Sequence, residues 1–206
     1  MSDTLTFYTN PQSRGQIIRW LLEELGQPYE TVLLDYGTTM KGPDYLAINP
    51  MGKVPAIKHG DQVITECAAI CAYLADAFPQ SGLLPPPERR GAYFRWLFFT
   101  AGPLEAIFTA KAIGWEVPAD KQGMAGFGSF DLAIDTIAGA LDGKAFVAGD
   151  RFSAADVYVA SLLDFMLNFK LVEPRPEFNA YLTPLRTRPA YVRAKEIDAA
   201  LVAANG

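Results

Sequence analysis

The chain has 206 residues, half of them hydrophobic and one fifth charged, which is enough to bury a core without metals or disulfides. Its 18 Lys and Arg against 23 Asp and Glu give a net charge of −5, which argues against a surface built to neutralise nucleic-acid phosphates. The two cysteines, Cys67 and Cys71, lie four residues apart in a helical pattern and predict neither a disulfide framework nor a zinc site. We therefore expect no metal and no nucleic-acid partner.

Nothing at the start of the chain resembles a targeting segment. Met1 to Thr4 lack the basic and apolar regions of a signal peptide. The most apolar stretch, Tyr93 to Phe99, is short and contains Arg95, whereas a membrane span needs about 18 or more apolar residues. With so few cysteines, these features predict a cytoplasmic protein with no membrane partner.

The first half of the chain alternates strand and helix patterns. Apolar residues from Ile17 to Leu25 follow one helical face, and Gly26 and Pro28 end that helix. The other predicted elements are strand 5–8, strand 29–34, a short segment 41–48, strands 54–58 and 62–65 as a hairpin, and helix 66–78. The predicted order is βαβ–ββα, in which a parallel pair with a crossover helix precedes the hairpin.

The second half reads as helical throughout. Residues 79 to 88 contain four prolines, a serine and a glycine, the composition of an interdomain linker. We place one domain at 1–79, the linker at 80–88 and an all-α domain at 89–206. The helical patterns cover 89–112, 121–141, 154–170, 176–186 and 189–203. Pro103 is expected to interrupt the first of these helices, and Gly123, Gly126 and Gly128 weaken the start of the second.

The helix that starts after Phe152-Ser153 has the signature of a capping box. Ser153 can cap the amide of Asp156, and the carboxylate of Asp156 can accept from the Ser153 amide. Phe152 and Val157 occupy the two positions of a hydrophobic staple. We interpret this pattern as a folding element and not as a ligand site.

Asn10-Pro11-Gln12-Ser13 lies between the first strand and the first helix, where a dithiol redox protein would carry Cys-x-x-Cys. The absence of thiols there excludes dithiol exchange at this position. A helix N-terminus nevertheless favours an anion such as a thiolate, and the Ser13 hydroxyl would add a donor. The alternative is that Ser13 is only an N-cap, with Gln16 completing a capping box.

The remaining reactive side chains offer little chemistry by themselves. His59 is the only histidine and falls in the predicted hairpin turn, which makes a Ser-His-Asp or Cys-His arrangement improbable. Cys71 is expected to pack as a small hydrophobe, and Cys67 falls in the first turn of its helix. The aromatic residues between Tyr93 and Phe108 are interpreted mostly as core.

Three stretches together resemble the cytosolic glutathione transferases, especially bacterial members. They are Phe7 to Gly15 running into Ile18 to Gly26, then Asn49 to Ile57, then Thr65 to Ile70 with Tyr73-Leu74. The resemblance covers nearly the whole chain, and the helix start at 152–157 matches a feature of the family's second domain. It implies a thioredoxin-like, glutathione-binding first domain followed by an all-helical domain that holds a hydrophobic substrate.

The resemblance assigns the first domain's glutathione contacts. Pro55 matches the family's cis-proline, which turns Val54 so that its amide and carbonyl pair with the peptide backbone of glutathione. Glu66 and Cys67 match the acidic-serine pair that holds the γ-glutamyl group at a helix N-terminus, although a thiol is a weaker donor than the family's hydroxyl. Lys53 and Lys41 match positions that meet the glycyl carboxylate.

The residue that stabilises the glutathione thiolate has three candidates. Ser13 matches the serine- and cysteine-type classes, Tyr8 matches the tyrosine-type position, and Asn10 is a third polar group; we rank them in that order. The thiolate would attack a hydrophobic electrophile in an interdomain cleft, with lining candidates Phe108, Trp115 and Phe165.

The resemblance also implies a homodimer, with contributions from 66–78 and 89–108. The alternatives are another glutathione-dependent reaction, such as dehalogenation, ether cleavage, isomerisation or peroxide reduction, and a non-catalytic interaction module.

Overall fold

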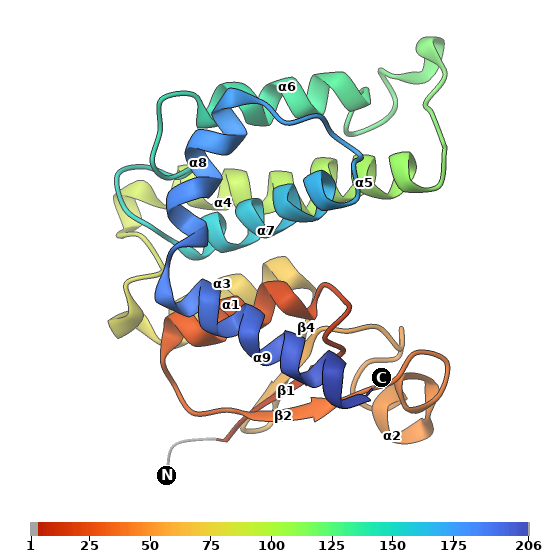
Figure 1. Cartoon of the computed structure of the whole chain (residues 1–206), viewed down its shortest axis with the longest axis vertical. Helices are drawn as coiled ribbons and strands as arrows, with labels where there is room; N and C mark the ends of the chain where they lie inside the picture. Colours follow the sequence, from red (N-terminus) through yellow and green to blue (C-terminus); the bar gives the residue numbers. More distant parts are fainter. Residues whose placement is uncertain (1–3, 206) are drawn as a thin grey trace. The chain divides into compact units, whose positions relative to one another are not determined.

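The structure is a computed structural model that describes residues 4–205. The chain forms two compact units: the first runs to Ser81 and resumes at Arg188, and the second comprises Gly82–Thr187. Both are shown in Figure 1. Residues 1–3, on which the prediction about a signal peptide rests in large part, lie outside the described residues.

The first unit is built on a four-stranded sheet in the order β2-β1-β3-β4, in which β1 pairs parallel with β2 and antiparallel with β3. Its elements are β1 Leu5–Thr9, α1 Gly15–Leu25, β2 Glu30–Leu33, η1 Thr39–Lys41, α2 Pro43–Leu46, β3 Ala56–His59, β4 Gln62–Thr65, α3 Cys67–Ala77, η2 Pro79–Ser81 and α9 Pro189–Asn205. The predicted βαβ–ββα order is confirmed. Strand β3 starts two residues later than predicted, after Pro55, which has no amide to give to a ladder.

The two faces of the sheet carry different cores. Successive side chains of a strand point to opposite faces, so Phe7 and Tyr8 in β1 separate. Phe7 is fully buried beneath the guanidinium of Arg19 from α1, at 4.9 Å from the ring centroid. Tyr8 packs against a cluster on the other face that includes Met40 and Tyr45. Helix α1 therefore covers one face of the sheet, and η1 with α2 covers the other.

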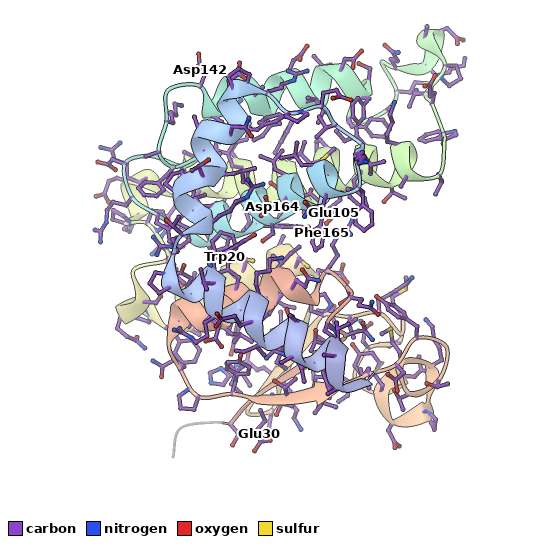
Figure 2. All side chains as sticks on the ribbon, in the orientation of Figure 1. Trp20, Glu30, Glu105, Asp142, Asp164 and Phe165 are labelled. Carbon is purple, nitrogen blue, oxygen red and sulfur yellow. The ribbon has the colours of Figure 1, made fainter. Side chains whose placement is uncertain are left out.

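Helix α9 lies along α1 and belongs to the first unit (Figure 1). The buried Arg19 pairs with Asp198 at 3.2 Å, and Glu24 accepts from Arg188 at 2.6 Å. The rings of Trp20, labelled in Figure 2, and Tyr191 meet edge to face at 4.9 Å. This packing differs from the predicted division, which grouped all of 89–206, because periodicity indicates a helix without indicating its partner.

The second unit is helical apart from an isolated bridge between Phe146 and Gly149. Its elements are η3 Pro87–Arg89, α4 Arg90–Phe99, the π-helical η4 Thr100–Leu104, α5 Glu105–Ala112, η5 Ala119–Lys121, α6 Phe130–Leu141, α7 Ala154–Asn168 and α8 Pro176–Arg186. Helix α7 is buried along most of its length and packs against α4 and α8, so it forms the centre of this core.

Two helix boundaries of this unit test the sequence analysis. As expected, the pattern at 89–112 is interrupted around Pro103, where the chain forms the wider π-helical segment η4. The predicted helix at 121–141 is wrong in its first part, since α6 begins only at Phe130. Gly123, Gly126 and Gly128 disfavour a helix there, and the chain forms an irregular loop.

The capping box at the start of α7 is confirmed. The carboxylate of Asp156 accepts from the amide and the hydroxyl of Ser153, each at 2.9 Å. It also accepts from the Val147 amide at 2.7 Å and the Tyr181 hydroxyl at 2.9 Å. Asp156 is completely buried, and this burial raises the pKa of its carboxyl group although the hydrogen bonds oppose the shift.

Candidate active site

The register of the sheet brings three predicted site segments to one edge. Tyr8 of β1 lies opposite Ala56 of β3, and Ala56 lies opposite Thr65 of β4. The loop after β1, the dipeptide before β3 and the residues after β4 therefore leave the sheet side by side. Helices α1 and α3 both begin at this edge, so both present their free N-terminal amides there.

Ser13 lies in the turn that leads into α1, and its side chain is half-buried. Its hydroxyl donates to the Asn10 carbonyl at 2.6 Å and accepts from the Gly15 amide at 2.9 Å. The Asn10 side chain is fully engaged, since its amide donates to the Leu34 carbonyl at 2.9 Å and its oxygen accepts from the Gln12 amide at 2.9 Å. Asn10 thus fixes the loop, and Ser13 keeps a hydroxyl near the helix start.

The predicted capping box between Ser13 and Gln16 is not formed. The Gln16 side-chain amide donates instead to the Pro11 carbonyl at 2.7 Å, and its oxygen accepts from Lys195 of α9 at 2.8 Å. A glutamine is long enough to reach past the helix start, and these two contacts use both of its ends. Sequence reasoning missed Lys195, because no local pattern links residues so far apart in the chain.

Gly15 allows α1 to approach the end of β1. A Cβ atom at Gly15 would lie 1.9 Å from the Oγ1 atom of Thr9 and 2.9 Å from the Oγ atom of Ser13. Thr9 is buried, so a larger residue at either Gly15 or Thr9 would require a shift of the loop. The glycine thereby sets the position of Ser13 relative to the sheet.

The Val54-Pro55 peptide bond is cis, as the family resemblance implies. The segment before it is tied down through the Lys53 carbonyl, which accepts from the Tyr45 hydroxyl at 2.5 Å and from the Asn49 side-chain amide at 2.8 Å. Burial is the main cause that raises the pKa of Tyr45 to about 12, so this phenol remains a donor at neutral pH. The backbone of Val54 is thus held at the edge of the sheet.

The two candidate lysines differ in their present contacts. Lys41 donates to the carbonyls of Gly52 at 2.7 Å and Met51 at 3.2 Å, so its ammonium holds the loop before β3. Lys53 is exposed, and within the described residues its ammonium makes no hydrogen bond or ion pair. Lys53 is therefore the better placed of the two to meet a free anion.

Glu66 and Cys67 lie where β4 passes into α3. Glu66 is exposed and has a positive φ of 66°, a backbone conformation that is sparsely populated and often found at ligand sites. The Cys67 thiol points to the Arg14 carbonyl at 4.0 Å and thereby links the starts of α3 and α1. Cys71 is fully buried, which raises the pKa of its thiol and agrees with a packing role.

Tyr8, the second thiolate candidate, is half-buried on the face opposite Phe7. Its ring packs against Tyr45 with centroids 5.7 Å apart. His59, at the end of β3, has its Nδ1 atom 2.8 Å from the Tyr73 hydroxyl, so the only histidine is paired with α3.

The three electrophile-pocket candidates all belong to the second unit, and they differ in burial and in surroundings. Phe108 is buried in α5 and meets Phe169 edge to face at 6.1 Å. Phe165 is half-buried on α7 and is labelled in Figure 2. Trp115 is 52% exposed and lines a cavity to which Phe108 and Phe165 do not contribute.

Within residues 4–205, no cluster of three or more His, Cys, Asp or Glu side chains has the spacing of a metal site. No helix in the same range combines the length and the apolar character needed to cross a bilayer.

Sequence profiles match both halves of the chain. The profile of the glutathione S-transferase N-terminal domain covers residues 13–77, and that of the glutathione S-transferase C-terminal domain covers residues 120–189. Glutathione S-transferase A of Pleuronectes platessa is 30% identical over 183 residues, which is 82% of this chain and 81% of the relative. Glutathione S-transferase GstB of Escherichia coli K12 is 28% identical over 180 residues, covering 82% and 86%.

Solved structures agree. A glutathione transferase from Methylococcus capsulatus superposes with a TM-score of 0.80 at 31% identity, over 95% of this chain and 99% of that one. A sphingomonad glutathione S-transferase complexed with glutathione gives a TM-score of 0.77 at 26% identity, over 94% and 98%. The predicted combination of a thioredoxin-like domain and a helical domain is thereby confirmed, and the chain belongs to the glutathione S-transferase family.

Proposed function

We propose that the chain binds glutathione at the edge of the sheet where β1 ends, β3 begins and β4 ends, and that it transfers the glutathione thiolate to a hydrophobic electrophile. The observation that carries the proposal is the row formed by Tyr8, Ala56 and Thr65, which gathers the Ser13 loop, Val54-Pro55 and Glu66-Cys67 at this edge. A neighbour of the same fold was solved in complex with glutathione, which supports the choice of ligand.

Each part of glutathione finds a matching group at this edge. The amide and carbonyl of Val54 can pair with the cysteinyl backbone as an added strand would. The γ-glutamyl carboxylate suits the free amides at the start of α3, next to Glu66 and Cys67. The exposed ammonium of Lys53 can meet the glycyl carboxylate, while Lys41 holds the loop behind it.

Ser13 is the proposed donor to the thiolate. Its hydroxyl lies beside the Gly15 amide at the start of α1 and donates its one proton to the Asn10 carbonyl. On binding, this proton would turn from that carbonyl to the thiolate, so that a hydroxyl and a helix N-terminus act on one anion. Asn10 is the weaker candidate because its side chain holds the loop through the Leu34 carbonyl and the Gln12 amide, and Tyr8 packs against Tyr45. A free thiol has a pKa of about 8.5, so lowering it by roughly two units would make most of the glutathione reactive at neutral pH.

Three variants test the assignment. Ser13→Ala is expected to raise the apparent pKa of bound glutathione by about one unit or more, read from the thiolate ultraviolet band, with little change in the dissociation constant of the neutral thiol. Tyr8→Phe and Asn10→Ala are the parallel variants, and thermal unfolding of each shows any loss of stability. If Tyr8→Phe raises the thiol pKa and Ser13→Ala does not, the tyrosine is the donor and the assignment is wrong.

We also infer a homodimer in the cytoplasm, where reduced glutathione is available. On α4, Phe94 and Phe98 stack at 6.2 Å and are 38% and 60% exposed, contrary to the expectation of a mostly buried aromatic segment. An exposed aromatic pair fits a self-complementary contact within the predicted range 89–108. Light scattering at micromolar concentration tests it, and a monomer would contradict the inference.

A further inference from the structure

Helix α9 packs on α1 within the first unit through mostly small side chains. Among the side chains of α9 that the structure describes, the buried ones are those of Ala190, Ala194 and Asp198. The larger Val192 and Val202 are exposed. Alanines let two helices approach closely, but they have no shape that fits one position along α1 better than the next. Other contacts therefore decide where each turn of α9 lies.

Near the start of α9 these contacts are partly exposed. The rings of Tyr191 and Trp20 meet edge to face, and the tyrosine is half-buried. Arg188 pairs with Glu24 at 2.6 Å, and the arginine side chain is 32% exposed. Partly exposed ion pairs contribute little, since water and salt screen them. The turn at 195–198, further along the helix, depends on a buried contact instead.

Arg19 and Asp198 form that buried contact. Their ion pair of 3.2 Å has side-chain exposures of 2% and 6%. Arg19 is also fixed from the side of β2, since it donates to the hydroxyls of Tyr29 and Thr31, each at 2.9 Å. Asp198 thus meets a charge whose position the first unit has already set. Breaking a buried ion pair is costly, so the pair favours the one arrangement of α9 in which both charges meet.

The same turn of α9 reaches the loop that carries Ser13. Lys195 lies three residues before Asp198, so the two side chains share a helix face. Lys195 donates to the Gln16 side chain at 2.8 Å, and Gln16 donates to the Pro11 carbonyl at 2.7 Å. The turn at 195–198 is therefore connected by hydrogen bonds to the segment just before Ser13.

The two contacts have matching spacing on the two helices. Gln16 and Arg19 lie three residues apart on α1. Lys195 and Asp198 have the same spacing on α9, so a shift of one contact moves the other. We propose that Asp198 is a positioning residue for glutathione activation. Its pairing with Arg19 keeps Lys195 in contact with Gln16, and that contact in turn holds the loop before α1. The last step rests on the proposed function of this loop.

The contact is tested first without glutathione, by the nitrogen–proton NMR spectrum of the full chain. Asp198→Ala and Lys195→Met should move the side-chain amide signals of Gln16 in the same direction, because both changes release its oxygen. Asp198→Asn keeps the shape and one acceptor, so it should move them less than about half as far. Glu196→Ala, at an exposed acid of the same helix, should not move them. Unchanged Gln16 signals in a folded Asp198→Ala variant would overturn the proposal.

The effect on the thiolate is tested next, through the thiolate ultraviolet band of bound glutathione. Asp198→Ala should raise the apparent thiol pKa by a few tenths of a unit, with less than about a twofold change in the dissociation constant of the neutral thiol. Addition of Lys195→Met to Asp198→Ala should give no further shift, because the contact with Gln16 is already lost. Two shifts that add would show that the residues act separately, which contradicts the proposal.

A comparison with the Ser13 variant separates this proposal from the proposed function. If Ser13→Ala raises the thiol pKa and a folded Asp198→Ala does not, the positioning role is overturned and the proposed function stands. If neither variant raises it, the assignment of Ser13 is wrong as well. Should Asp198→Ala fail to fold, Arg19→Lys replaces it in both measurements with the same expected results, since it loses the planar fork that meets the carboxylate.

Discussion

Helices α1 and α7 each begin next to a serine that the sequence predicts as a cap, and the two starts are built differently. At α7, Ser153 and Asp156 are buried and form the reciprocal box, with Val147 and Tyr181 as further donors to the carboxylate. At α1, Ser13 is half-buried and bonds only within its own loop. The same residue type therefore forms a buried capping box at α7, whereas at α1 it closes a local turn and is the proposed donor to the glutathione thiolate.

The residue three positions after each serine explains the difference. Asp156 is short and charged, so its carboxylate turns back to the helix start and gathers four donors. Gln16 is longer and neutral, and it spans from the Pro11 carbonyl to Lys195. A serine followed three residues later by an acid or amide thus predicts a formed capping box more reliably when the second residue is an aspartate that other elements bury.

The largest expected effect is on stability at the start of α7. Asp156→Ala should lower the free energy of unfolding by about 3–5 kcal/mol, because the four donor groups lose their acceptor, at roughly 1–3 kcal/mol for each one that stays buried and unpaired. Gln16→Ala, the matched change at α1, should cost less than about 1 kcal/mol. Urea unfolding of both variants measures the contrast. Equal losses would show that the two helix starts are energetically alike.

The start of α1 also differs from that of α7 because Gly15 lets α1 approach the end of β1 closely. Gly15→Ala should lower stability by about 1–3 kcal/mol, because the new methyl group would lie 1.9 Å from Thr9 Oγ1 and must displace the loop that carries Ser13. Gly139→Ala in the exposed face of α6 meets nothing within 4 Å and should instead stabilise by about 0.5–1 kcal/mol.

A double variant identifies the clash as the cause. Thr9→Ala should recover part of the stability lost in Gly15→Ala, since it removes the oxygen in question. If thermal unfolding shows the two changes to be additive, the close approach of α1 to β1 does not explain the loss.

Much of this architecture follows from local sequence. The strand-helix alternation and the Ser153 box are each specified by a few adjacent residues, and the structure confirms both. The cis bond before Pro55, which the family resemblance implies, is confirmed as well. The shared edge of Ser13, Val54 and Glu66 was reached through the family resemblance, and the register of the sheet gives its geometric reason.

What could not be predicted depends on contacts between distant segments. The periodicity of 189–203 indicates a helix, but the pairing of Asp198 with Arg19 that places it against α1 has no local signal. Part of the loop 113–129 was predicted as the start of a helix over 121–141, although α6 begins only at Phe130. Three glycines there favour an irregular backbone, and the cavity that Trp115 lines results from it.

The two helix starts should also differ in pH dependence, since the residue three positions after the serine is a carboxylic acid at α7 and a neutral amide at α1. The pKa of Asp156 is raised by burial, so the folded state holds its proton over a window above the unfolded value of about 3.9. Within that window the unfolding free energy falls as pH rises. The stability of the wild type relative to Asp156→Asn should therefore increase as pH is lowered from neutral towards about 4.

Denaturant unfolding at a series of pH values measures this difference, and subtraction of the variant removes the other carboxylates. Gln16→Ala should show a difference from wild type that does not change with pH. A relative stability of wild type that decreases on acidification would mean that the hydrogen bonds to Asp156 outweigh its burial.

The smallest expected effect concerns the connection from α9 to the Ser13 loop, which the α7 start does not have. Lys195 donates to Gln16 at 2.8 Å, and Gln16 donates to the Pro11 carbonyl at 2.7 Å, two residues before Ser13. Lys195→Met should raise the pKa of bound glutathione by a few tenths of a unit, since one unit corresponds to about 1.4 kcal/mol and a positioning contact supplies less. The thiolate ultraviolet band gives the pKa, and Lys144→Met, at an exposed lysine of the second unit, controls for the loss of a positive charge.

Gln16→Leu should produce a shift of similar size, and the Lys195→Met/Gln16→Leu double variant should add little to either, because both changes break one chain of hydrogen bonds. Additive shifts would show that Lys195 acts through its charge and not through the position of the loop.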